Sequence, residues 1–110
     1  MEAAASLLDA GYPDFAVERA FFSMYYIASD WLGVKERAST NHKATIAAFR
    51  RKFGAQENLA MFVEYLAEAE KTRAIVEMSR DRELTVEEAK LHIRRAGDFL
   101  KMAEEKLKGA

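Results

Sequence analysis

The feature of this chain that most constrains its fold is the recurrence of apolar residues at steps of three and four along nearly its whole length. Such spacing lines one face of an α-helix, whereas a strand would need apolar residues at every second position. The sequence holds no sustained alternation of that second kind, and its single proline is Pro13. We therefore expect an all-α protein, a mostly up-and-down bundle of four to five helices, because the connections are short.

Glycines and capping residues set the limits of the expected helices. Gly11, Gly33 and Gly54 each end an apolar stretch, and Thr85 with Glu88 has the spacing of a capping box. These signals predict helices over residues 2–10, 13–32, about 40–53 and about 57–79, and a last helix that starts near residue 85.

Length and charge narrow the class of protein. The 110 residues fit a single domain spanning 1–110, and 17 basic against 18 acidic residues leave a formal charge of −1. We expect no DNA partner, because no global positive field exists, and no membrane span, because no apolar run approaches about 20 residues. The chain lacks cysteine and begins without a signal peptide, so we expect a cytoplasmic protein.

The common catalytic and metal-binding signatures are missing from the sequence. Neither His42 nor His92 has a glutamate three residues before it, since Ser39 and Ala89 stand there. The Glu-x-x-His pairs of a carboxylate-bridged di-iron bundle are therefore absent, as are phosphate-binding glycine loops and nucleophile elbows. We expect neither a metal nor a cofactor, and we expect His92 to lie on the surface, one step off the apolar seam of the last helix.

His42 opens the apolar stripe of the third expected helix, followed on the same face by Ile46, Phe49 and Phe53. Unpaired backbone N–H groups of the first helical turn surround it, Ser39, Thr40 and Asn41 precede it, and Lys43 follows. Such a group could hold a phosphate. In the alternative, His42 hydrogen-bonds a neighbouring helix while Ser39 or Thr40 caps its own.

Two further polar features lie on otherwise apolar helices. Arg73 occupies a core position of the fourth expected helix, so its guanidinium must find partners or lie at a cleft or subunit interface. The second helix carries one polar stripe, made of Arg19, Ser23, Tyr26 and Asp30. This stripe is either a ligand site or a structural network. The same helix has two apolar flanks, which predicts a homodimer.

Two segments resemble small HEPN-domain proteins. Residues 15–26, FAVERAFFSMYY, resemble the Arg-Ala-Tyr-Tyr-Ala-Met-Phe helix of that family, and residues 41–46, NHKATI, resemble its Ser-His-Lys-Gly-Val-Ile segment. The spaced phenylalanines at 49 and 53 and the last helix, from residue 85 to 100, are also similar. The likeness covers nearly the whole chain.

The resemblance implies a dimerising helical bundle, often encoded beside a minimal nucleotidyltransferase with which it forms a toxin–antitoxin-type pair. Many members are metal-independent ribonucleases that use an arginine followed, four to six residues later, by a histidine. Here residues 73–78 resemble the minimal subgroup reading Arg, three residues, Asp-Tyr, with Glu77 and Met78 in the last two places. No histidine follows Arg73 in the required window, so we expect weak or no nuclease activity from the chain alone.

Three functions are compatible with these observations. The favoured one is a dimeric module that binds a nucleotide, an RNA or a nucleotidyltransferase partner, with candidate binding residues Arg19, Tyr26, Ser39, Thr40, His42, Lys43 and Arg73. The second is an endoribonuclease in which Arg73 stabilises the charge on the phosphorane and His42 acts as acid or base. The third is a structural helical dimer without a ligand.

Overall fold

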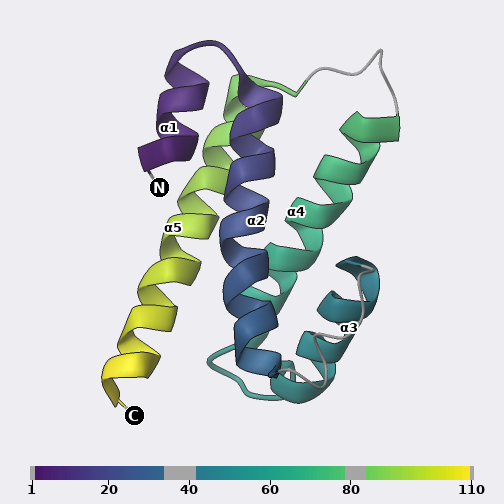
Figure 1. The fold of residues 1–110 in the computed structure, drawn as a ribbon, viewed down its shortest axis with the longest axis vertical. Coiled ribbons are helices and arrows are strands. Elements are labelled where there is room, and N and C mark those ends of the chain that lie inside the picture. Colours follow the sequence, from purple (N-terminus) through teal and green to yellow (C-terminus); the bar gives the residue numbers. More distant parts are fainter. Residues whose placement is uncertain (1, 34–41, 79–83, 110) are drawn as a thin grey trace.

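The protein is described by a computed structural model that covers residues 2–33, 42–78 and 84–109. These residues form five α-helices: α1 (Glu2–Asp9), α2 (Pro13–Leu32), α3 (His42–Phe53), α4 (Ala60–Met78) and α5 (Val86–Gly109) (Figure 1). The prediction of an all-α bundle is confirmed. The candidate residues Ser39, Thr40 and Asn41 lie outside the described part of the chain.

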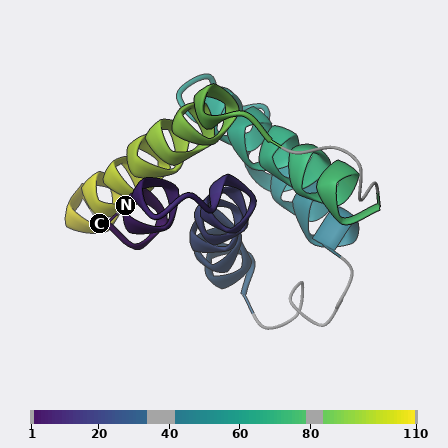
Figure 2. The same cartoon turned by 90° about the horizontal axis from the view of Figure 1, so that it is seen from above.

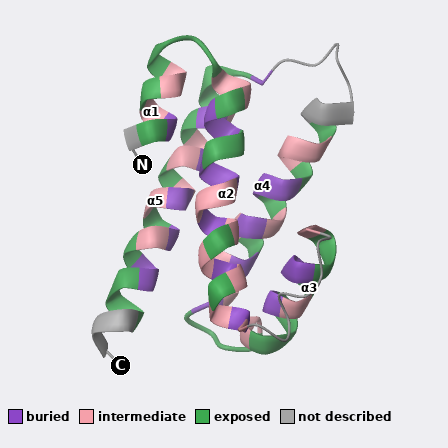
Figure 3. Cartoon of the chain, viewed as in Figure 1, coloured by how far each residue is buried: buried purple, intermediate pink, exposed green. Residues whose placement is uncertain are grey.

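Helix α2 is the centre of the bundle, and it packs against each of the other four helices. Figure 2 shows α2 lying in the angle between α5 on one side and the α3 and α4 pair on the other. The residues it buries come from both predicted apolar flanks, and they include Val17, Ala20, Phe21, Met24 and Ala28. Buried residues face inward on the surrounding helices as well (Figure 3). The chain itself therefore covers most of the surface that predicted a dimer.

Among helices that follow one another in the chain, α1 and α2, α3 and α4, and α4 and α5 run antiparallel (Figure 1). Helices α2 and α3 instead run parallel. The first residue of α3, His42, lies against Tyr25, whereas Phe53 at its end lies against Trp31.

Where the structure describes them, the predicted helix limits agree with it to within one residue, except at the start of α4. Helices α2 and α3 end one residue before Gly33 and Gly54, and Gly33 has a φ of 88°, a conformation that favours glycine. Helix α4 begins at Ala60 rather than near residue 57. The carbonyl of Gln56 accepts the N–H groups of both Leu59 and Ala60, so a turn occupies the expected first helical positions.

The capping box of α5 is present, but the buried face of this helix is rotated from the predicted seam. The backbone N–H of Thr85 donates to Oε1 of Glu88, and the N–H of Glu88 donates to Oγ1 of Thr85. Val86 is 49% exposed, while His92 and Phe99 are buried. The prediction of a surface position for His92 was wrong, because the buried face of α5 extends to the positions beside the predicted seam.

Within the described ranges, none of the helices combines the length and the apolar character needed to cross a membrane.

Candidate functional site

Three polar side chains from α3 and α4 meet at the first turn of α3. The guanidinium of Arg73 donates from Nη2 to Nδ1 of His42 at 3.0 Å. Oε2 of Glu70 lies 3.4 Å from Nε of Arg73 and 3.7 Å from Nδ1 of His42. Because α3 and α4 are antiparallel, the start of α3 reaches the second half of α4, where Glu70 and Arg73 are one turn apart. We call these three residues the His42 cluster.

Aromatic rings of α2 form one wall of the His42 cluster. The imidazole lies 4.8 Å from the ring centre of Tyr25 and 5.5 Å from those of Phe21 and Phe22. The guanidinium of Arg73 lies over the last two rings, 5.4 and 5.5 Å from their centres. A cation over aromatic faces is stabilised by the ring quadrupole, and more strongly where water is excluded.

The hydrogen bond between Arg73 and His42 assigns the tautomer of the imidazole. An arginine side chain is always a donor, so Nδ1 of His42 must accept, and the ring proton of the neutral form is on Nε2. The imidazole therefore has one acceptor nitrogen, which Arg73 already occupies, and one donor nitrogen, Nε2.

Burial makes the charges of the His42 cluster interdependent. The side chains of Glu70, Arg73 and His42 are 12%, 15% and 27% exposed. A carboxylate this far from water needs a cation beside it, because removing one partner leaves an uncompensated charge. The remaining exposure is largest at His42, so the imidazole is the member of the cluster that solvent reaches most easily.

Some of the predicted site residues come together and others lie elsewhere. His42 and Arg73, predicted from separate helices, are in direct contact, and Lys43 lies beside them on an exposed position of α3. Arg19 and Tyr26 line a different hollow of about 290 Å³ between α1 and α2. Phe22 borders that hollow and also contacts His42, so the two places share one ring.

Glu70 is the site residue that sequence reasoning missed. It follows Ala69 on a helix rich in glutamate, a residue type that usually lies on the surface, yet only 9% of its surface is exposed. The available signal was its spacing, because residue 70 lies one turn before Arg73 and can share its face.

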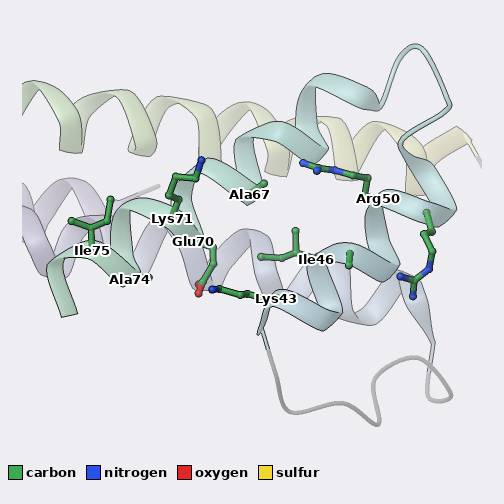
Figure 4. Close-up of a pocket in the computed structure, with 10 residues that line it drawn as sticks. Lys43, Ile46, Arg50, Ala67, Glu70, Lys71, Ala74 and Ile75 are labelled. Atoms are coloured by element: carbon green, nitrogen blue, oxygen red, sulfur yellow. The ribbon is translucent and has the colours of Figure 1, made fainter. Parts of the chain in front are cut away.

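A groove of about 620 Å³ lies between α3 and α4, and its lining includes Lys43 and Glu70 (Figure 4). Its lining combines aliphatic and basic side chains, and it comprises Lys43, Ile46, Ala47, Arg50, Arg51, Ala67, Glu70, Lys71, Ala74 and Ile75. The basic residues of α3 are exposed, and Arg50 pairs with Glu64 at 2.7 Å.

The second histidine is buried away from this site. His92 is 5% exposed, and its Nδ1 has no hydrogen-bond partner among the described residues. Burial lowers its pKa from the ordinary value of 6.5, and the positive charge of Arg95 lowers the pKa further against the opposing effect of Glu68 and Glu88. The imidazole of His92 is therefore neutral in the folded protein at neutral pH.

In the part of the chain that the structure describes, no three histidine, aspartate or glutamate side chains gather in a way that could hold a metal ion. Fold and site together define a small all-helical protein with a partly buried histidine, glutamate and arginine cluster at the junction of three helices.

Comparison with known proteins gives one similar sequence. The chain is 29% identical over 101 residues to a protein of Methanocaldococcus jannaschii named "Putative toxin MJ0142", and the alignment covers 91% of this chain and 69% of that protein. No protein-family model matches the chain, and no solved structure matches it. The resemblance to HEPN-domain proteins remains a prediction.

Proposed function

We propose that this chain is one component of a toxin–antitoxin-type pair and acts by binding a phosphodiester or nucleotide at the His42 cluster. The observation that carries the proposal is the contact of His42 with Arg73 at 3.0 Å, beside the exposed Lys43. The sequence similarity to a protein named as a toxin supports the biological setting. A partner nucleotidyltransferase and a homodimer belong to the same proposal, through the resemblance to HEPN-domain proteins.

A bound anion would engage the cluster by competing for the guanidinium of Arg73. Nη2 of Arg73 now donates to the neutral Nδ1 of His42, and it would turn to the anion, because hydrogen bonds to a charged acceptor are the stronger ones. Lys43, exposed beside His42, would add a second positive charge. Anion binding therefore exchanges the bond between Arg73 and His42 for bonds to the ligand.

This exchange gives the proposal a direct test. The dinucleotide TpT is a suitable probe, because it carries a single phosphodiester and lacks the 2′-hydroxyl that cleavage would need. We expect amide resonances of His42 and Lys43 to shift on titration. Added salt should weaken the binding.

Matched variants separate the His42 cluster from general electrostatics. His42→Gln should change the affinity for TpT, whereas His92→Gln, still folded, should leave it within about twofold of the parent. Lys43→Ala should weaken binding, whereas Lys52→Ala, at an exposed position on the same helix, should leave the affinity within about twofold of the parent. A titration that moves neither the His42 nor the Lys43 amide would refute the proposal.

A second function, metal-independent RNA cleavage, is favoured by the presence of an arginine and a histidine in one site. Arg73 would stabilise the charge of the phosphorane, and His42 would move the proton. In the observed state, however, the acceptor nitrogen of His42 is occupied by Arg73, so a general base is present only after that hydrogen bond opens. This geometry makes binding the better supported function.

The cleavage of a mixed RNA pool in the presence of a chelator distinguishes the two functions. We expect little or no cleavage by the chain alone. Chelator-resistant cleavage that is lost in both His42→Gln and Arg73→Lys, each still folded, would place the ribonuclease first.

A further inference from the structure

The groove between α3 and α4 is long enough to bind a short helical segment. It involves residues 43–51 of α3 and 67–75 of α4, so its lining extends about 12 Å along each helix at about 1.5 Å per residue. That length corresponds to about two turns of a third helix laid alongside. An occupant would therefore present side chains at positions i, i+3 or i+4, and i+7.

The floor of the groove is aliphatic, and its edges are basic. Ile46, Ala47, Ala67, Ala74 and Ile75 supply the apolar surface, and Ile75 is left 39% exposed. Exposed basic residues line the groove from both helices, and they are Lys43, Arg50, Arg51 and Lys71. Of these, Arg50 also pairs with Glu64. The acid in the lining, Glu70, already faces Arg73 and His42.

We infer that this groove binds an acidic amphipathic helix of the protein partner. This inference rests on the proposed function and states the chemistry of its partner. The basic edges complement glutamate or aspartate on the flanks of such a helix, and the aliphatic floor takes its apolar face. Single-stranded RNA fits this groove less well. Proteins that bind it stack its bases on aromatic side chains, and none of the described lining residues is aromatic.

The test is a selection from a displayed library of helical peptides with randomised surface positions, using the full chain as bait. Ala47→Glu places an acid on the exposed groove floor, and Ala44→Glu places the same acid on the same helix outside the groove. We expect enriched peptides to carry apolar residues at helical spacing with acidic flanks. Their affinity should fall about tenfold or more with Ala47→Glu and change less than about twofold with Ala44→Glu.

Two further arms identify the occupant and separate this inference from the proposed function. Lys71→Glu should weaken the selected peptides, and Lys52→Glu should not. Enrichment that is equal on Ala47→Glu and the parent, or that favours basic peptides, would overturn the inference. RNA binding that the same groove variants abolish would assign the groove to RNA instead. TpT binding that survives in Ala47→Glu while peptide binding is lost would show that cluster and groove are separate sites.

Discussion

Arg73 has a structural role in addition to any contact with a ligand, because its Nε lies 3.4 Å from Oε2 of the buried Glu70. Arg73→Ala should lower the free energy of unfolding by about 2–3 kcal/mol, below the 3–5 kcal/mol of fully buried pairs because the cluster retains some exposure. Urea denaturation measures this change. Lys71→Ala, one exposed position away from Glu70, is the control and should change stability by less than about 0.5 kcal/mol. A similar loss for both variants would contradict the assignment.

His92 should make the stability of the protein fall in mild acid. Burial lowers its folded-state pKa below the unfolded value near 6.5, so the unfolded chain binds the proton more tightly. The contribution is fully present above that value and is lost as the pH falls below it, by at most about 1.4 kcal/mol per pH unit. Thermal unfolding from pH 8 to pH 5 should show this fall, and His92→Leu should reduce it. An unchanged pH profile in His92→Leu would exclude His92 as the cause.

Sequence reasoning located His42 and Arg73 because each interrupts an apolar stripe, and the structure shows the two in contact. It could not predict that the two side chains touch, because their contact depends on how α3 and α4 pack against each other. Glu70 was missed, and His92 was wrongly predicted to lie on the surface, for a related reason. Each lies one position beside a predicted stripe, and a rotation of one residue about the helix axis decides whether such a side chain is buried.

Helix α5 shows which features of an element can be predicted locally. Its capping box involves Thr85 and Glu88 alone, so spacing along the chain was sufficient to predict it. Its buried face depends on which helices it packs against, and here those are α1, α2 and α4. The start of α4 likewise depends on a turn formed by Gln56.

The capping box gives a prediction at this scale. Thr85→Ala should remove the hydroxyl that accepts the N–H of Glu88 and should lower the free energy of unfolding by about 1 kcal/mol. Guanidinium denaturation measures the change. Lys90→Ala, which removes an exposed pair with Glu87 at 3.9 Å, should have a smaller effect. If Thr85→Ala is as stable as the parent, the capping box contributes nothing to α5.

At the scale of the whole molecule, the arrangement of α2 explains why so short a chain can hold a polar cluster. Helix α2 packs against the other four helices and so buries side chains on both sides of the angle seen in Figure 2. Its aromatic residues lie against His42. The chain measures 39 × 28 × 22 Å, so few residues are far from a surface. A second protein or a second copy would therefore bury surface that the single chain cannot.

The homodimer remains a prediction, and the structure specifies the face to test. Phe15 and Tyr26 are 58% and 66% exposed, and with Arg19 and Phe22 they recur at steps of four, three and four along α2, the spacing of a helix seam. A twofold axis would let this face cover itself. Light scattering at micromolar concentration should give about twice 12.5 kDa. Phe15→Glu combined with Tyr26→Glu should give a monomer, whereas Met61→Glu, on an exposed apolar residue of α4, should remain dimeric. A parent chain that is monomeric and normally stable would rule out this interface.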